Sequence, residues 1–427
     1  MQLAESVEPN KRADVWTVRL RDGVQFHNGR PLGADDLIFT IRRILDPKTV
    51  ARGATSIAYV DAANLRKLDA RTVRVPLNSP TVTFPDDMSE YYMGVVPVGY
   101  DPASPVGTGP FRYESFTPGQ QSIFVRNPHY WEPSEPLLDA VQIIDIADDT
   151  ARVNALLSGQ VQAISNLPAS EVGSVKSAGA KVLNSETGGW TPITMRCDLK
   201  PFDDVRVRQA FRLIADRQQL VDLALSGYGR VANDMYSPYD PDYDHNIPQR
   251  HQDIEQAKSL LRAAGREGMS IEMVTSPVYV GVVQAAEVFA QQAKAAGVKV
   301  SLRQVDTATF YGPNYLKWNF AEDFWGTYSF LVQAGQGSLP NSPYNEPHWN
   351  DPTFISLVQQ ARRTIDDGKR RELVYAAQEI HHASSGDIIW GFFNLLDGHG
   401  AKVGGLQTSV LGYGLNGYNF RKVGYLA

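Results

Sequence analysis

The sequence predicts an α/β fold with more than one domain, and three observations lead to this prediction. The chain has 427 residues, a length that usually corresponds to two or three domains. Residues 16–21 alternate between apolar and polar side chains, as the residues of a half-buried strand do. Residues 270–302 follow a strand–helix–strand pattern, which places two parallel strands in one sheet with a right-handed crossover.

The composition excludes several classes of protein. Hydrophobic residues make up 43% and charged residues 21%, the balance of an ordinary globular protein. The net charge of −6 argues against a nucleic-acid-binding surface, which would need a basic stripe. The single cysteine, Cys197, excludes an internal disulfide, and the cysteine spacings typical of zinc or redox sites are missing. No apolar run of about 18 residues is present, so no transmembrane helix is expected.

The first block of elements ends near Leu138. The strand at 16–21 is followed by a helix over 34–45, which has two aspartates in its first turn, where the helix dipole favours them. Two further strands are expected at 73–77 and 122–126, on either side of a stretch rich in proline and glycine. These elements predict a small mixed domain.

The middle of the chain begins with a different kind of strand. Val141–Ile146 is nearly continuous in apolar residues, which predicts a strand covered on both faces. A helix follows and ends at Gly159, and two more helices are expected near 203–214 and 218–226.

The last block contains the strand–helix–strand unit and then an aromatic segment at 320–330. A loop rich in glycine, proline, serine and asparagine occupies 333–351. The block is expected to end with two amphipathic helices, at 353–365 and 370–381, and a buried strand at 387–394.

The order of several motifs resembles that of the extracellular solute-binding proteins of peptide- and nickel-type ABC importers, the dipeptide/oligopeptide-binding class. The first motif covers residues 3–6 and 16–32, and the remaining segments follow in the family's order. They are 106–111 (VGTGPF), 126–131 (RNPHYW), 155–161 (ALLSGQV), 201–211 (PFDDVRVRQAF) with Asp216-Arg217 behind it, and 257–265 (AKSLLRAAG). Each segment alone is modest evidence, whereas the ordered set is specific.

The resemblance implies a three-domain clam of the periplasmic-binding-protein type. Domain two would be residues 1–138, domain one would be 139–269 with 401–427 returning to it, and domain three would be 270–400. Solute would be enclosed in a cleft at the hinge between domains one and three, and the domains would close around it by rigid-body motion. Family members carry a signal and the first strand of domain one ahead of the point where this chain starts. The resemblance therefore implies that the N-terminal part of domain one is missing.

The resemblance also implies a function. The chain is expected to bind a small solute outside the cytoplasm, in the periplasm or as a cell-surface lipoprotein, and to deliver it to the permease subunits of an ABC importer. A monomer without a cofactor is expected. The first residues do not form a signal peptide. A ligand sensor or chaperone on the same fold is the alternative, and a hydrolase is a more distant one.

No catalytic or metal-binding constellation supports the hydrolase. The nucleophile motif G-x-S-x-G and the zinc motif H-E-x-x-H do not occur. Glu322 and Asp323 are neighbours on an expected strand, so their carboxylates point to opposite faces and cannot flank one bond. We expect neither catalytic residues nor a metal site.

The candidate ligand-binding residues begin with Trp325, Gly326, Thr327 and Tyr328. In the family, the segment that matches them lines the cleft in domain three, and peptide-binding members place an aspartate just after the tryptophan to pair with the α-ammonium group. Here no carboxylate follows Trp325. An unpaired ammonium group is unfavourable in a closed cleft. A non-peptide solute, such as a glycoside, an opine-like compound or a secondary metabolite, is therefore at least as well supported as a peptide. The alternative for Trp325 is a place in the hydrophobic core.

Four further candidates come from other parts of the chain. By resemblance, Trp190 and Arg196 lie on the domain-one side of the cleft, on a loop and the strand after it, and each has a structural role as its alternative. Tyr92 would reach the cleft from domain two, and Asn394 would lie near the second crossing of the hinge.

Overall fold

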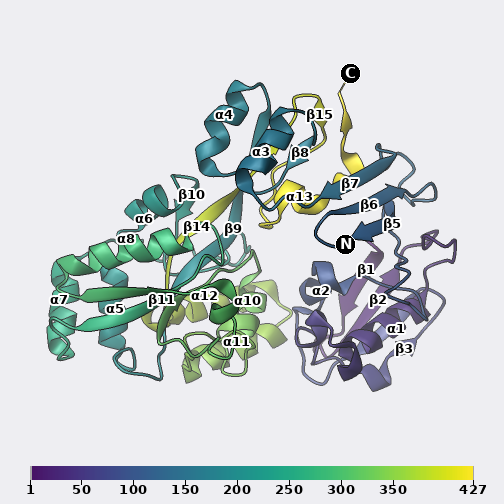
Figure 1. The fold of residues 1–427 in the computed structure, drawn as a ribbon. Coiled ribbons are helices and arrows are strands. Elements are labelled where there is room, and N and C mark those ends of the chain that lie inside the picture. The colour runs from purple at the N-terminus through teal and green to yellow at the C-terminus, as the bar shows by residue number, and fades with distance from the viewer. Residues whose placement is uncertain (1, 427) are drawn as a thin grey trace.

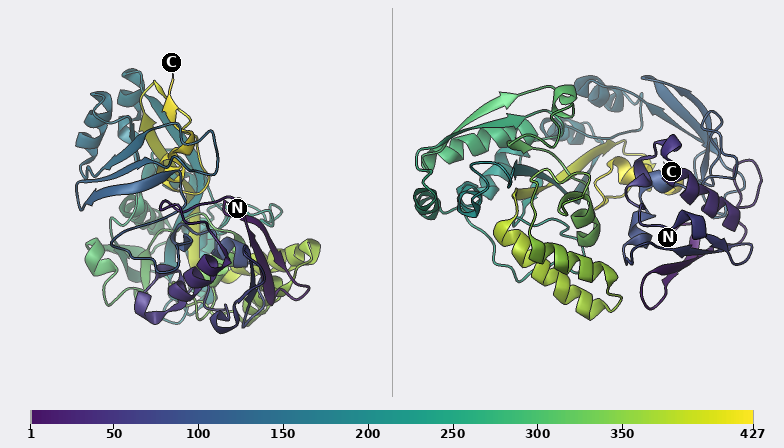
Figure 2. Two further views of the ribbon diagram at one scale, coloured as in Figure 1. Left: turned by 90° about the vertical axis from the view of Figure 1, so that its right-hand side faces the viewer. Right: turned by 90° about the horizontal axis from the view of Figure 1, so that it is seen from below.

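The computed structural model describes residues 2–426, which form an N-terminal block beside an upper and a lower lobe (Figures 1 and 2). The N-terminal block is residues 2–110. The upper lobe is residues 111–180 and 400–426, and the lower lobe lies between them in sequence. Two long antiparallel strands, β9 (Lys181–Met195) and β14 (Asp387–His399), run from one lobe into the other.

The N-terminal block contains a four-stranded antiparallel sheet of order β1-β2-β4-β3. Its strands are β1 (Ala4–Pro9), β2 (Val15–Leu20), β3 (Arg66–Lys67) and β4 (Thr72–Pro76). The predicted helix is α1 (Ala34–Leu45), whose apolar stripe packs on the sheet with Trp16 and Val75 in one core. A short helix, α2 (Phe84–Asp87), and 3₁₀ turns complete the block; the turns lie at Pro47–Thr49, Arg52–Ala54, Ala62–Asn64 and Tyr91–Met93.

The upper lobe contains a three-stranded antiparallel sheet, β5-β6-β7. Its strands are β5 (Phe111–Thr117), β6 (Gln121–Arg126) and β7 (Ala140–Ile144). The prediction that the last strand is covered on both faces is wrong. Ile143 is 40% exposed and Ile144 37% exposed, and no residue of β7 belongs to a buried cluster within residues 2–426. An apolar sequence makes a strand suitable for burial between two layers, but it does not determine whether other elements pack on both of its faces.

The rest of the upper lobe packs around the ends of β9 and β14. A small core of Val153, Leu156, Val175 and Leu396 joins its helices to β14. The elements are α3 (Asp149–Leu157), β8 (Ala163–Ile164), the 3₁₀ turn Ala169–Glu171, α4 (Val172–Ser177), β15 (Val403–Gly404), α13 (Gly414–Tyr418), the 3₁₀ turn Phe420–Lys422 and β16 (Gly424–Tyr425).

The lower lobe is built on a mixed sheet of order β10-β14-β9-β13-β11-β12, with β8 paired to the far end of β14. The remaining strands are β10 (Gly229–Val231), β11 (Ser270–Thr275), β12 (Lys299–Gln304) and β13 (Phe320–Glu322). The predicted strand–helix–strand unit is confirmed, because β11 and β12 are parallel and α8 (Val282–Ala295) connects them.

Helices cover this sheet in two groups. The first group shares the largest core, around Phe211, Phe289 and Trp390, and comprises α5 (Val205–Ile214), α6 (Arg217–Ala224), α7 (Ile254–Ala263) and α8. The second group packs around Trp349 and Phe354 and comprises α10 (Phe330–Gly337), α11 (Pro352–Arg363) and α12 (Asp367–Ser384). The short helix α9 (Thr307–Phe310) packs with Ala321 in a smaller cluster.

Trp190, predicted to lie on a loop, belongs to β9 together with Gly188 and Gly189 before it. The two glycines are required by packing rather than by a turn. A Cβ atom on Gly189 would overlap the ring of Phe393, and one on Gly188 would lie 2.8 Å from the methyl group of Thr327. The sheets also cross the predicted domain bounds, since β6 pairs with β7 and β9 pairs with β13. The three domain ranges stay a prediction.

A buried charge network fastens the loop after β10 to this sheet. Asp234 is fully buried, and its Oδ2 lies 2.6 Å from Nη2 of Arg217 and 2.7 Å from Nε of Arg250. Its Oδ1 accepts a hydrogen bond from the backbone N–H of Ile389 in β14. Burial alone would raise the pKa of Asp234, but the charges of the two arginines outweigh burial and lower the pKa.

We predict that Asp234→Asn lowers the free energy of unfolding by about 3–5 kcal/mol, because it leaves buried arginines without their counter-charge. A carboxylate with a lowered pKa stabilises the fold only while it is ionised. The difference between wild type and variant should therefore begin to shrink as the pH falls below the ordinary aspartate pKa, about 3.9, and should continue to shrink toward the lower pKa of the folded state. Urea unfolding at several pH values measures this. The control is Asp145→Asn, at an exposed position, with an expected change within about 0.5 kcal/mol. Equal stability of the two variants would contradict the prediction.

Candidate ligand-binding site

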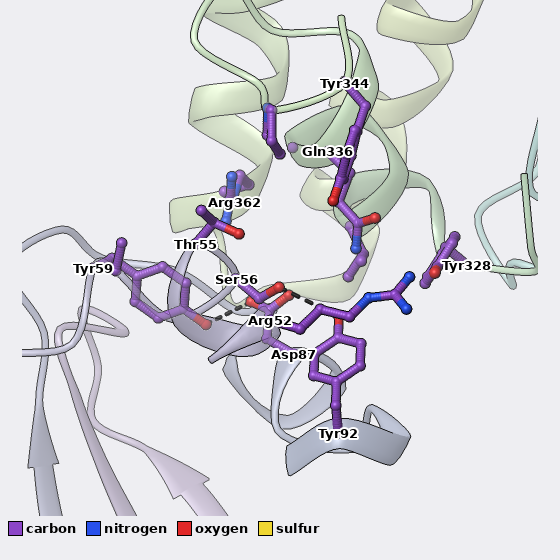
Figure 3. A pocket seen from close by; sticks show the side chains of 14 residues that line it. Arg52, Thr55, Ser56, Tyr59, Asp87, Tyr92, Tyr328, Gln336, Tyr344 and Arg362 are labelled. Carbon is purple, nitrogen blue, oxygen red and sulfur yellow. Dashed lines mark hydrogen bonds between the residues drawn. The ribbon is translucent and has the colours of Figure 1, made fainter. Parts of the chain in front are cut away.

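A cavity of about 260 Å³ lies between the N-terminal block and the lower lobe (Figure 3). One wall comes from the 3₁₀ turn at 52–54, the residues after it and the segment 87–92. The other comes from residues 328–344 and from the end of α11. The lining residues are Arg52, Thr55, Ser56, Ala58, Tyr59, Asp87, Tyr92, Tyr328, Val332, Gly335, Gln336, Pro343, Tyr344 and Arg362.

Arg52 extends from the N-terminal block toward Tyr328 on the opposite wall (Figure 3). Its guanidinium carbon lies 5.6 Å from the ring centre of Tyr91 and 5.5 Å from that of Tyr92. Its Nη1 donates a hydrogen bond of 2.6 Å to the hydroxyl of Tyr91. Two aromatic rings and one hydroxyl thus hold the guanidinium group and leave most of its N–H donors free.

A column of stacked aromatic rings supports the opposite wall. Trp325 stacks on Trp190 at 5.8 Å between ring centres, Trp190 stacks on Tyr236 at 5.8 Å, and Tyr236 stacks on Phe330 at 5.2 Å. The edge of Tyr344 contacts Trp325 at 5.9 Å. The column therefore supports Tyr344, which lines the cavity. The inner rings of the column, Trp190, Tyr236 and Phe330, lie in the hydrophobic core.

Several polar groups point into the cavity without a partner in the protein. Among residues 2–426, no group is hydrogen-bonded to the hydroxyl of Tyr328, the hydroxyl of Tyr344 or the side-chain amide of Gln336, all of which line the cavity. The hydroxyl of Tyr92 has only a long contact of 3.5 Å with Ser56. Together with Arg52, these groups form a lining in which hydrogen-bond donors predominate.

The one carboxylate among the lining residues, Asp87, is hydrogen-bonded through one oxygen, Oδ2. Asp87 accepts hydrogen bonds from the hydroxyl of Tyr59 at 2.5 Å and from the hydroxyl of Thr83 at 2.8 Å. Burial raises the pKa of Asp87 to about 6, although these bonds and the charge of Arg362 oppose the rise.

Glu90 lies beside the cavity and contributes a charge that depends on pH. Burial raises its pKa to about 7, with a further rise from Asp87 and an opposing effect from Arg52. Its carboxyl group acts electrostatically on Tyr92, Tyr328 and Tyr413. At neutral pH, Glu90 therefore neutralises only part of the charge of Arg52.

Of the residues singled out from the sequence, Tyr92 and Tyr328 line the cavity. Trp325 lies behind Tyr344, and Trp190 is 3% exposed, inside the aromatic column. The hydroxyl of Thr327 donates to the carbonyl of Val410 and accepts from the N–H of Gly188, so it joins the two lobes; its neighbour Gly326 is not among the lining residues.

Two other predicted residues lie away from the cavity. Arg196 forms a bidentate pair with Asp198, and Asn394 donates to Asn184 on the neighbouring strand β9. The binding roles of all eight residues stay predictions.

Arg52, Gln336 and Tyr344 are among the lining residues that no sequence pattern singled out. Arg52 belongs to an isolated 3₁₀ turn, and Gln336 and Tyr344 lie on and after a short helix in a segment predicted to be a loop. The cavity forms only when two distant segments of the chain meet, so no local pattern marks these residues.

The adjacent acids Glu322 and Asp323 are hydrogen-bonded to different side chains. Glu322 accepts from the hydroxyl of Thr275, whereas Asp323 accepts from Tyr311 and Tyr315. No group of three or more histidine, cysteine, aspartate or glutamate residues within 2–426 is arranged to hold a metal ion.

Comparison with known proteins identifies the family. The model of "Bacterial extracellular solute-binding proteins, family 5 Middle" matches residues 1–354. The chain belongs to this family. The resemblance seen in the sequence is therefore confirmed, and the protein is a solute-binding protein of the kind that serves ABC importers.

A relative and two solved structures illustrate the range within the family. Di/tripeptide-binding protein 1 of Pseudomonas aeruginosa is 28% identical over 425 residues, covering 88% of this chain and 78% of the relative. The structure of AgaA from A. tumefaciens R10, in complex with agropinic acid, has a TM-score of 0.84 at 23% identity and covers 100% of this chain and 89% of that chain. The Helicobacter pylori periplasmic binding protein DppA, in complex with a peptide, has a TM-score of 0.82 at 22% identity, with coverages of 99% and 88%. These structures confirm the predicted α/β clam-type fold.

Within residues 2–426, no helix is both long enough and apolar enough to cross a membrane. The family consists of binding proteins that act outside the cytoplasm, as its description states.

We predict that the Glu90 carboxyl group titrates near pH 7 and that Arg52→Gln raises its pKa further, because the variant removes the nearby positive charge. NMR titration of side-chain carboxyl carbons measures the midpoint, and Glu90→Gln assigns the signal. Arg66→Gln, at an exposed position in β3, is the control and should leave the midpoint unchanged. A midpoint near the ordinary glutamate pKa, about 4.3, would show that the carboxyl group is solvated.

Proposed function

We propose that this protein captures a small non-peptide solute carrying a carboxylate group, holds it in the cavity between the N-terminal block and the lower lobe, and delivers it unchanged to an ABC permease. The observation that carries the proposal is the set of unpartnered donors in this cavity, led by Arg52. Ligand sites combine apolar walls with a few convergent polar groups, and this cavity has both features.

The guanidinium group favours a carboxylate as its partner. Arginine presents N–H donors in a planar fork that matches the two oxygens of a carboxylate, and such charge-assisted bonds are stronger than neutral ones. The hydroxyls of Tyr328 and Tyr344 lie on the opposite wall and are available to further acceptor oxygens of the same solute. The tyrosine rings supply apolar faces for its carbon skeleton.

An ordinary peptide is less well matched. Its α-ammonium group needs a buried acceptor, preferably a carboxylate, but Oδ2 of Asp87 already accepts from Tyr59 and Thr83. The residues after Trp325 are Gly326, Thr327 and Tyr328, none of which is acidic. Similar proteins bind either kind of solute, since one structure of this fold holds agropinic acid and another holds a peptide. The lining of this cavity supports the former kind.

The remaining parts of the proposal follow from family membership. The protein acts outside the cytoplasm as a monomer, docks transiently on permease subunits and carries out no chemical reaction. Glu322 and Asp323 support the last point, because Glu322 accepts a hydrogen bond from Thr275, and Asp323 accepts hydrogen bonds from Tyr311 and Tyr315.

We predict that the bound solute raises the melting temperature and is recovered chemically unchanged. A ligand that binds only the folded state stabilises it by mass action. A native mass spectrum of the purified protein identifies the solute that copurifies, and chromatography of a mixture incubated with excess solute tests its integrity. Recovery of a modified solute in more than stoichiometric yield would contradict a pure binding role.

We predict that Arg52→Gln weakens binding of the carboxylate solute roughly tenfold to a hundredfold, since hydrogen bonds to charged groups contribute about 1.5–3 kcal/mol. Trp325→Ala should weaken binding by about 1–3 kcal/mol, because it removes the support behind Tyr344. Calorimetric titration with the copurified solute, agropinic acid and a dipeptide library measures these effects, and Arg66→Gln is the matched control. Micromolar binding of ordinary dipeptides that survives both substitutions would reject the proposed solute class and site.

A further inference from the structure

Beside the cavity, a chain of hydrogen bonds crosses from the lower lobe to the N-terminal block. Arg362 lies near the end of α11, and its Nε and Nη2 donate to the hydroxyls of Thr81 and Thr83, each at 3.3 Å. The carbonyl of Arg362 accepts a hydrogen bond of 2.7 Å from the N–H of Val82. One residue of the lower lobe thus contacts three successive residues of the N-terminal block.

The hydrogen bonds of this chain all have the same direction of donation, from Arg362 toward Asp87. Thr83 donates its only hydroxyl proton to Asp87, so in the 2.8 Å contact between the two threonine hydroxyls Thr81 is the donor. The sequence of donors is therefore Arg362, Thr81, Thr83, and the final acceptor is Asp87. A cation begins the chain and a carboxylate ends it, so each bond polarises the next.

The threonine side of the contact is buried, and the arginine side packs closely against a glycine. Thr81 and Thr83 are each 2% exposed, and the carbonyl of Thr81 also accepts from the indole N–H of Trp16 in the block's core. On the lower lobe, the Arg362 guanidinium group packs against Gly335, where a Cβ atom would lie 3.0 Å from Nη1. Both sides of the contact are therefore closely packed.

We propose that Arg362 and the Thr81–Thr83–Asp87 relay form a latch that holds the N-terminal block against the lower lobe, and that Arg362 is a positioning residue for the cavity beside it. Arg362 and Asp87 also line the cavity, while Arg52 and Tyr328 face each other across it from the two parts that the latch joins. Releasing the latch moves the two walls apart without removing any of the free donors.

The test measures the distance between the two parts in protein free of solute. Spin labels are attached at Lys48→Cys in the block and Lys369→Cys in the lower lobe, both exposed positions, in a Cys197→Ala background. Double electron–electron resonance should give one narrow distance distribution for this doubly labelled protein, which is the parent for the variants below. In Arg362→Met, the fraction of molecules at longer distances should rise about tenfold, as expected for the loss of a charge-assisted hydrogen bond.

A second variant and a control keep the test decisive. Thr83→Val keeps the shape of the side chain but interrupts the relay, and it should lengthen the distance in the same sense. Arg363→Met removes an exposed arginine next in sequence and should leave the parent distribution unchanged. The latch is refuted if either folded variant of Arg362 or Thr83 keeps the parent distribution, or if Arg363→Met lengthens it equally. Because no solute is present, this result stands apart from that of the proposed binding function.

Discussion

The pairing of β9 with β14 is the constraint on which the rest of the structure depends. The upper ends of the two strands pair through Lys181 and His399, and the lower ends pair through Thr194 and Asp387. Register shifts occur between Ile389 and Asn394, where Gly189 makes room for the ring of Phe393. Both lobes are connected through this pair of strands. We therefore expect the pair to bend at the register shifts between Ile389 and Asn394. The N-terminal block lies outside the pair and is held against the lower lobe by its own contacts.

The candidate cavity depends on this arrangement for its two walls. It is not a preformed groove within one sheet, because one wall belongs to the N-terminal block and the other to the segment between Tyr328 and Tyr344. Each wall is rigid by itself: cation–π contacts with Tyr91 and Tyr92 hold Arg52, and the aromatic column holds Tyr344. The relative position of the walls is then the variable that decides whether donors on both sides reach one solute.

Elements with a strong hydrophobic periodicity could be predicted from the sequence. Predictions were wrong where the outcome depends on which other elements pack against a segment. The helix at 34–45 and the parallel pair around α8 follow from apolar stripes and caps. The apolar run at β7 was expected to be covered, and Trp190 was expected to lie on a loop, because hydropathy and glycine content do not report which neighbours are present. In the site, resemblance pointed to Tyr92 and Tyr328, but Arg52 and Tyr344 become neighbours only through the meeting of segments almost three hundred residues apart, roughly two typical domain lengths.

The column of Trp325, Trp190, Tyr236 and Phe330 has an optical consequence. Two indoles stacked at 5.8 Å and inclined by only 11° are close enough for their electronic transitions to couple. Trp190 is shielded from water, whereas Trp325 is partly exposed and stands directly behind the cavity wall. Near-ultraviolet circular dichroism and the emission wavelength of these indoles therefore form a built-in reporter of the cavity wall, readable without any added dye.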